Sequence, residues 1–231
     1  MAEPAGNELR FMGKITRHVT HEMTNVLAAV GENAALIQDV LSYSGGEAVS
    51  SHERISRAFR TIEHQIARGV ELSSRLNRFA HGTDEAETAI DLNALLLQIG
   101  SFAERLAQLK SVGIRVAPDD RPLDLVGRPM SIQMAIFDCL EFILDRLEPH
   151  TTVVIKSRAI GNGAAAVDFS PEPSSQALEP DVETLSPRPQ WTALEQSIER
   201  VGGRLTAEEP SCWFSLVFLP RSDIPIPQKE S

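Results

Sequence analysis

Apolar residues recur every three or four positions over two long stretches of the chain. The first stretch carries Ile15, Val19, Met23, Val26, Val30, Ala34, Ile37 and Leu41. The second carries Ile55, Phe59, Ile62, Ile66, Val70, Ser73, Leu76 and Phe79 or Ala80. This rhythm predicts two amphipathic helices, from about Asn7 to Ser42 and from about Ser51 to His81, because each apolar series falls on one helix face. Ser44-Gly45-Gly46 separates them.

Two long helices with a short connection form an antiparallel hairpin. One hairpin buries two such apolar stripes poorly, whereas two copies make a four-helix bundle around a twofold axis. Residues 1–82 therefore predict a dimerisation domain and a homodimer.

The pattern changes after residue 82 to shorter elements. Residues 83–90 read as a polar linker, 91–222 as a second domain and 223–231 as a loose tail. Helices are expected at 91–111, 129–147 and 191–201, and strands at 113–116, 123–127, 152–157, 164–169 and 212–220. A Pro-, Ser- and Glu-rich stretch, 170–190, reads as a loop. The whole chain is thus predicted to be α+β, with a helical hairpin followed by an α/β domain.

The charge excludes several classes of partner. The chain of 231 residues has a formal charge of -10, which disfavours nucleic acid and anionic membrane surfaces. No apolar run approaches the roughly 20 residues of a membrane span, and the N-terminus does not resemble a signal peptide. Cys139 and Cys212 lie in apolar contexts and are expected to be buried free thiols. These features predict a cytoplasmic protein.

One phrase on the first helix carries candidate chemistry: His21-Glu22-Met23-Thr24-Asn25. At about 100° per residue, His21 lies roughly 160–200° from Val19 and Met23, so it faces away from the apolar stripe. Asn25 follows one turn later on the same face. A His-Glu pair on a solvent-exposed helix face is common, so the pair alone does not indicate a function. The residues around it in the sequence have to be considered as well.

The string from Phe11 to Ala28 resembles the phospho-acceptor box of two-component sensor histidine kinases. Val26 stands where that family usually has proline, so we expect a weaker helix bend here. Asp91-Leu92-Asn93, Gly113-Ile114 and the segment Glu199–Leu205 resemble the family's ATP-binding domain. The resemblance covers nearly the whole chain. It implies a phospho-acceptor hairpin followed by an ATPase-like α/β sandwich.

The resemblance also locates the family's nucleotide boxes, and they are altered here. Phe142 stands where the family has an asparagine for Mg²⁺, and Asp138 stands at the preceding asparagine. Asp168 keeps the acid of the first glycine box and could meet an adenine amino group, but residues 169–172 contain no glycine. Residues 185–191 also lack glycine, and Gly161-Asn162-Gly163 reads as a turn. We therefore expect a degenerate ATP-binding domain that binds no cofactor, with Mg²⁺ supplied only by a partner.

Three functions remain open. His21 could carry a phosphoryl group between response-regulator receiver domains, with Glu22 orienting the ring, in a histidine phosphotransferase. Asn25 could instead orient the water that hydrolyses a receiver's aspartyl phosphate. A non-catalytic receiver-binding protein is the third reading.

Lys14, Arg17 and His18 are the expected partner-binding residues, since basic groups suit a receiver's acidic pocket. No metal site is expected: His18, His21 and Glu22 lack a further ligand.

Overall fold

The computed structural model describes residues 3–42, 48–84, 87–161, 163–172, 189–206 and 213–219. The chain divides into two compact units, one formed by Leu9–His81 and the other by Met1–Glu8 together with Gly82–Ser231. Cys212, the predicted tail 223–231 and most of the predicted loop 170–190 lie outside the described residues. No helix in the described part of the chain is both long enough and apolar enough to span a membrane.

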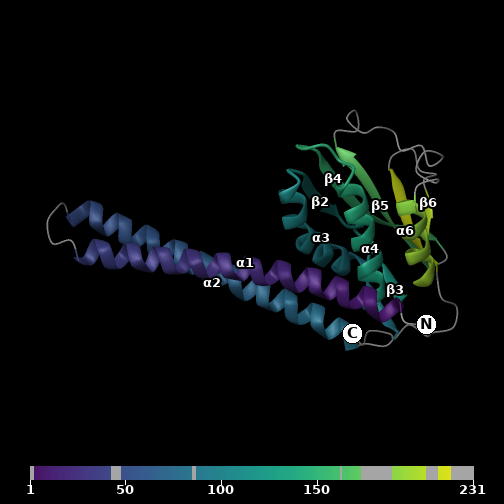
Figure 1. Ribbon diagram of the computed structural model, residues 1–231, viewed down its shortest axis with the longest axis horizontal. Coiled ribbons are helices and arrows are strands. Elements are labelled where there is room, and N and C mark those ends of the chain that lie inside the picture. Colours follow the sequence, from purple (N-terminus) through teal and green to yellow (C-terminus); the bar gives the residue numbers. More distant parts are fainter. Residues whose placement is uncertain are drawn as a thin grey trace. The chain divides into compact units, whose positions relative to one another are not determined.

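The first unit is a hairpin of two long helices, α1 (Glu3–Ser42) and α2 (Ala48–Asp84) (Figure 1). The predicted helices are confirmed: α1 begins at Glu3 instead of Asn7 and ends at Ser42 as predicted, whereas α2 extends beyond both predicted ends. The helices approach closely at Gly69, where an added Cβ would meet Val26 Cγ1 at 3.3 Å. Near the open end of the hairpin, the rings of Phe11 and Phe79 meet edge to face with centroids 5.5 Å apart.

The line that each helix buries differs in part from the predicted stripe. Ile15, Val19 and Val26 are buried as expected. Several predicted stripe positions are instead exposed: Ala34, Leu41, Phe59, Ile66 and Val70. On α2 the buried positions are Ala58, Gly69, Leu72 and Phe79. The apolar arc of each helix is wider than the single seam that one partner helix covers, so part of it stays in contact with solvent.

The second unit contains a five-stranded sheet in the order β2-β4-β5-β7-β6. β2 (Gly113–Ala117) pairs parallel with β4 (Thr152–Gly161), and the other neighbours pair antiparallel. The remaining strands of this sheet are β5 (Ala164–Glu172), β6 (Gly203–Thr206) and β7 (Phe214–Phe218). β1 (Thr88–Asp91) and β3 (Asp124–Gly127) form a separate antiparallel pair.

Three helices pack on one face of the large sheet: α3 (Leu92–Leu109), α4 (Pro129–Leu144) and α6 (Pro189–Arg200) (Figure 1). Local signals set their ends. Asp91 caps α3 by accepting hydrogen bonds from the backbone N–H groups of Asn93 and Ala94. Pro129 opens α4, where its missing N–H costs nothing. Gly202, with a φ of 77°, follows the end of α6.

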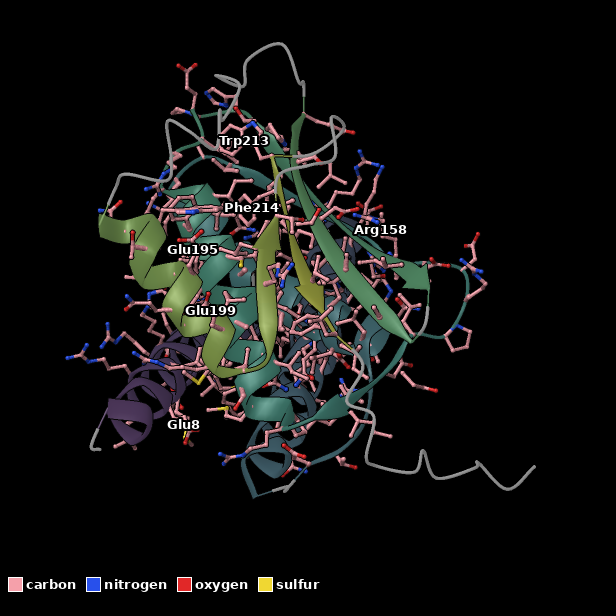
Figure 2. All side chains as sticks on the ribbon, turned by 90° about the vertical axis from the view of Figure 1, so that its right-hand side faces the viewer. Glu8, Arg158, Glu195, Glu199, Trp213 and Phe214 are labelled. Carbon is pink, nitrogen blue, oxygen red and sulfur yellow. The ribbon has the colours of Figure 1, made fainter. Side chains whose placement is uncertain are left out.

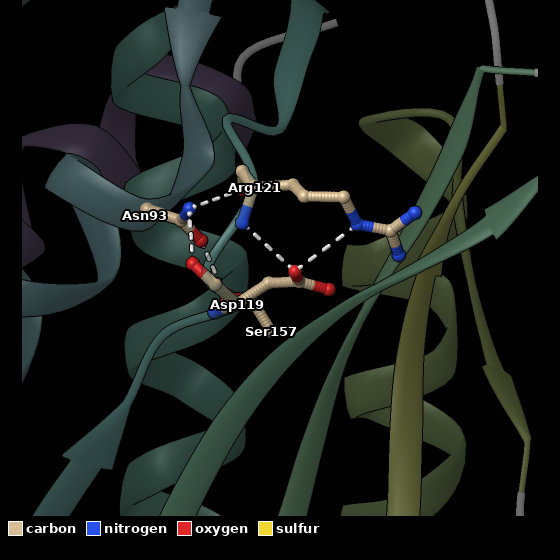
Figure 3. Close-up of polar contacts among 4 residues, drawn as sticks. All are labelled: Asn93, Asp119, Arg121 and Ser157. Carbon is tan, nitrogen blue, oxygen red and sulfur yellow. Dashed lines mark hydrogen bonds and ion pairs between the residues drawn. The ribbon is translucent and has the colours of Figure 1, made fainter.

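Asn93 also ties the start of α3 to the loop between β2 and β3 (Figure 3). Its amide nitrogen donates to the carbonyl oxygens of Asp119 at 3.1 Å and Arg121 at 2.9 Å. Its amide oxygen accepts from the Ser157 hydroxyl on β4 at 2.6 Å. The Ser157 hydroxyl in turn accepts from the backbone N–H of Asp119 at 2.9 Å. Asn93 therefore has a structural role in this unit.

Several predicted boundaries are corrected by the structure. The expected linker 83–90 contains the last two residues of α2 and most of β1, and the expected loop at 170 begins later because β5 runs to Glu172. β6 was not predicted as a strand. The predicted turn between 161 and 163 is confirmed by the antiparallel pairing of β4 with β5 and by the positive φ of Gly161 and Gly163, 103° and 76°.

Candidate functional site

His21 lies on the exposed side of α1, as its spacing from the apolar stripe predicts. Its neighbours on the buried side of the helix, Val19 and Val26, pack in the hairpin. Asn25 is also exposed, and its amide nitrogen Nδ2 lies 3.3 Å from His21 Nδ1. The imidazole is thus open to a partner at Nε2 and is contacted at Nδ1 by the amide one turn further along the helix.

Glu22 points in a different direction from His21, toward α2. Its carboxylate lies 3.6 Å from the guanidinium of Arg68 and 3.7 Å from His18 Nε2. The side chains of His18 and Glu22 are each only 17% exposed, so the group is half-buried between the helices. We expected Glu22 to orient the His21 ring. The recorded charge partners of Glu22 are instead His18 and Arg68, and the recorded contact of the His21 ring is with Asn25.

Arg68 is a member of this site that the sequence alone did not single out. It lies 46 positions from Glu22 in the chain, and only the register of the two helices brings them together. The same register places Gly69 against Val26 and Met23, on the side of α1 that packs in the hairpin.

The half of the hairpin that contains His21 is basic within an acidic chain. Residues 9–25 and 68–81 together contain six Lys or Arg and two Glu, a formal charge of +4. Lys14 and Arg17 are exposed, as a partner surface requires. On α2, the pKa of the Glu71 carboxyl is lowered because Arg75 donates a hydrogen bond to it at 2.8 Å and adds positive charge.

An aromatic cluster occupies the position where the sequence resemblance led us to look for a Mg²⁺-binding asparagine. Phe142 on α4 meets Trp191 on α6 at 5.3 Å and Phe214 on β7 at 6.0 Å between ring centroids. All three side chains are buried. The guanidinium carbon of Arg146 lies 3.5 Å from the centroid of the Phe142 ring, and Arg146 also donates to Gln190 at 2.7 Å. This position therefore holds hydrocarbon and a cation rather than a metal-binding oxygen.

Asp168, the retained acid of the first glycine box, lies on the other face of the sheet. It sits within β5 opposite Ser215, whose hydroxyl donates to Asp168 Oδ1 at 2.6 Å. Arg158 Nε donates to Asp168 Oδ2 at 2.8 Å. Phe214, the next residue along β7, points to the face covered by α4 and α6, so Ser215 and Asp168 point away from those helices. In Figure 2, Phe214 and the two labelled acids of α6, Glu195 and Glu199, lie toward the left of the view, and Arg158 lies toward the right.

The other nucleotide-box positions contribute to packing or are not described. Asp138 on α4 accepts a hydrogen bond from the Ser197 hydroxyl of α6 at 3.3 Å, which joins the two helices. Residues 185–188 lie outside the described residues, whereas Trp191 belongs to the aromatic cluster. Phe142 and Asp168 are therefore not brought together into one site.

Metal-binding and thiol chemistry have little support in the described residues. Among them, no three His, Cys, Asp or Glu side chains converge as metal ligands. Cys139 is a buried free thiol, as predicted. Burial raises its pKa well above the usual value, and the neighbouring Asp138 charge adds to the shift, so the thiolate form is disfavoured.

No family model matches the chain, and no curated protein matches it. Among solved structures it is similar to the cytoplasmic segment of the histidine kinase QseC (13% identity, TM-score 0.43, covering 68% of this chain and 95% of that one). It is also similar to the Acinetobacter baumannii histidine kinase AdeS (11% identity, TM-score 0.43, covering 86% of this chain and 96% of that one). A third similar structure is the histidine kinase ThkA in complex with the response regulator protein TrrA (15% identity, TM-score 0.44, covering 91% and 61%). These similarities are limited to identities of 11–15% and TM-scores of 0.43–0.44.

Proposed function

We propose that this protein is a histidine phosphotransferase that moves a phosphoryl group between response-regulator receiver domains through His21. The observation that carries the proposal is the exposed imidazole of His21, contacted at Nδ1 by Asn25 and surrounded by the basic half of the hairpin. The first step is attack of the imidazole on the aspartyl phosphate of a receiver. The bond from phosphorus to the aspartate oxygen breaks, and a bond from phosphorus to nitrogen forms.

The basic surroundings favour docking of an acidic receiver. A receiver's phosphorylation pocket is built from carboxylates and carries the Mg²⁺ that the transfer needs, so this chain need not supply a metal. Lys14 and Arg17 are exposed on the same helix as His21 and within two turns of it, where they can meet that pocket. His18, packed against Glu22, borders the same surface.

A kinase that phosphorylates itself needs a nucleotide site, and the second unit argues against one. Phe142, Trp191 and Phe214 fill the space at the family's metal-binding position, and Asp168 is engaged by Arg158 and Ser215 on the opposite face. The proposal therefore excludes ATP-dependent autophosphorylation. The protein receives its phosphoryl group from a phosphorylated receiver instead.

The proposal includes a homodimer formed through α1 and α2. The motivating observation is a set of large apolar side chains that remain exposed on the hairpin, including Leu27, Ile66 and Val70. A second hairpin would cover them in a four-helix bundle.

The experiment is transfer of labelled phosphate from a phosphorylated receiver to the protein. Wild type should gain an acid-labile, base-stable label, and His21→Ala should gain none. His64→Ala, which removes another exposed histidine from the hairpin, is the matched control and should be labelled like wild type. A fully labelled His21→Ala variant, or an unlabelled wild type with every receiver of the source organism, would contradict the proposal.

A phosphatase is the second candidate, because the exposed amide of Asn25 could align a water with the phosphorus of a docked receiver. In that case Asn25→Ala would lose receiver dephosphorylation while His21→Ala keeps part of it, since water is then the nucleophile. If the protein neither carries phosphohistidine nor speeds receiver dephosphorylation, receiver binding without catalysis is the remaining function.

A further inference from the structure

Glu22 follows the acceptor His21 in the sequence, yet its carboxylate lies against two possible counter-charges within the hairpin. It is 3.6 Å from the guanidinium of Arg68 on α2 and 3.7 Å from Nε2 of His18, one turn earlier on α1. Only 17% of the Glu22 side chain is exposed. A carboxylate held largely away from water is costly without a counter-charge, so these partners determine how much negative charge remains beside His21.

The two partners of Glu22 are not equivalent. A guanidinium stays protonated in proteins, whereas an imidazole carries a positive charge only when both of its nitrogens are protonated. Arg68 is therefore the permanent counter-charge, and His18 is a conditional one. Glu71, three residues further along α2, has an arginine of its own, because Arg75 lies 2.8 Å from it. Among the recorded ion pairs of the described residues, Arg68 serves Glu22 alone.

The charge beside His21 matters because only a neutral imidazole can attack phosphorus. A protonated ring has no free electron pair on either nitrogen. A carboxylate without a counter-charge near the ring favours the protonated form, whereas a carboxylate paired with a guanidinium favours it much less. An imidazole titrates near neutral pH, so a modest change in nearby charge alters its neutral fraction at pH 7.

The other charged side chains of α1 near His21 are basic. Arg17 lies one turn before it and Lys14 two turns before it, and both are exposed. Residues 9–31 contain a single acid, Glu22. Since positive neighbours disfavour a proton on the ring, the pairing of Glu22 determines whether the local charge favours a neutral imidazole.

We infer that Arg68 is a positioning residue of the proposed phosphotransfer, on which the inference rests: it holds and neutralises Glu22, so that the ring of His21 remains uncharged and able to attack. Arg68 contacts neither the reacting nitrogen nor phosphorus in this role and acts only through Glu22. The electron pair of the neutral ring forms the P–N bond, and the electron pair of the broken P–O bond leaves with the receiver's aspartate. Neither Glu22 nor Arg68 gains or loses a proton in this step.

Arg68→Gln removes the counter-charge and keeps a polar side chain. The His21 ring of this variant should be half protonated at a pH about one unit above the wild-type value, which lowers its neutral fraction at pH 7 about threefold. Single-turnover transfer at saturating receiver should slow by the same factor at pH 7 and approach the wild-type rate above about pH 8.5, where both rings are neutral. A role in docking or in folding alone would not give a loss that disappears as the pH rises.

Glu22→Gln tests whether Arg68 acts through Glu22. Combined with Arg68→Gln, it removes the unpaired acid and should restore both the titration of His21 and the transfer rate. Arg68→Lys keeps the positive charge and should stay close to wild type. Arg57→Gln makes the same change at an exposed arginine three turns earlier on α2, so it is the matched control and should alter neither measurement.

The titration is followed through the ring proton resonances of His21, assigned by their absence in His21→Ala, and needs no receiver. An unmoved titration in Arg68→Gln, or a moved one that Glu22→Gln fails to restore, would overturn the inference. Slow transfer by Arg68→Gln that persists at high pH would also overturn it, because Arg68 would then act in another way. A wild-type protein without phosphohistidine would overturn the proposed function, and the titration would still decide whether Arg68 controls the charge of His21.

Discussion

Phe142 and Asp168 lie on opposite faces of the five-stranded sheet. Phe142 packs against Phe214 on the face covered by helices, whereas Asp168 bonds to Ser215, the next residue of the same strand, on the other face. The resemblance noted in the sequence led us to expect that these two positions would serve one nucleotide. In this chain Phe142 presents a hydrocarbon ring, and both carboxylate oxygens of Asp168 already accept hydrogen bonds, one from the Ser215 hydroxyl and one from the Arg158 guanidinium.

We therefore predict that the protein does not bind Mg²⁺-ATP. Calorimetric titration with a non-hydrolysable ATP analogue and Mg²⁺ should give no binding heat. Phe142→Asn should not create binding either, because Asp168 would still face the other way. Mg²⁺-dependent binding in the low micromolar range by wild type would contradict the prediction and reopen autophosphorylation.

The architecture was largely readable from the sequence, because long helices repeat their apolar signal many times. The α1 and α2 stripes each span several turns, so the helices and the exposed side of His21 follow from a rotation of about 100° per residue. Short strands give little signal. β6 has four residues, Gly203–Thr206, and the strand β1 was read as linker because it also has only four.

Contacts between segments distant in the chain could not be read from the sequence. Arg68 reaches Glu22 only because of the hairpin register. Pro171 and its neighbours were read as loop, yet Pro171 pairs with Val153 near the end of β5, where tertiary pairing overrides local preference. The choice between Glu22 and Asn25 as the neighbour of the His21 ring depends on side-chain direction, which spacing along one helix does not determine.

Acid should weaken the second unit through Asp119. The pKa of its carboxyl is lowered, first because the backbone N–H of Arg121 donates to it at 3.0 Å and also because the Arg121 charge is near. A carboxyl with a lower pKa in the folded state stabilises the protein above its unfolded-state pKa, and this stabilisation is lost as the pH falls through the folded-state pKa. The free energy of unfolding should therefore fall less steeply in Asp119→Asn than in wild type between about pH 5 and about pH 2.

Urea denaturation across this pH range measures the effect. Asp124→Asn, which changes an exposed acid at the start of β3, is the control and should follow wild type more closely. Identical slopes for wild type and Asp119→Asn would show that the loop bond contributes nothing to the pH dependence.

The exposed apolar side chains of the hairpin predict a dimer. Leu27 is 64%, Ile66 53% and Val70 62% exposed in the single chain, and burying each such side chain contributes roughly 1.5–3 kcal/mol. Light scattering should give twice the chain mass of 25.3 kDa. Changing both Ile66 and Val70 to Lys should yield the single-chain mass, because two charges cannot be buried in the seam of a bundle.

Leu109→Lys is the control for that experiment. Leu109 is equally exposed but ends α3 in the second unit, so its substitution should leave the dimer intact. A wild-type protein with the mass of one chain at micromolar concentration would remove the dimer from the proposal.

Charge reversal should separate docking from chemistry. Arg17 and Lys14 are exposed within two turns of His21, so Arg17→Glu should weaken binding of an acidic receiver and slow transfer at low receiver concentration. Adding Lys14→Glu should slow it further, and added salt should reduce the difference from wild type, since exposed charges are screened. At saturating receiver the rate should recover, because neither residue contacts the reacting nitrogen.

Arg57→Glu provides the matched reversal, since Arg57 is also exposed but lies on α2 in the half of the hairpin away from His21. It changes the charge of the whole protein by two units, as Arg17→Glu alone does, so a general electrostatic effect would appear in it as well. If transfer by Arg17→Glu matches transfer by Arg57→Glu at every receiver concentration, the basic residues beside His21 do not form the dock. The receiver would then have to approach His21 from another side of the helix, with contacts that local charge does not govern.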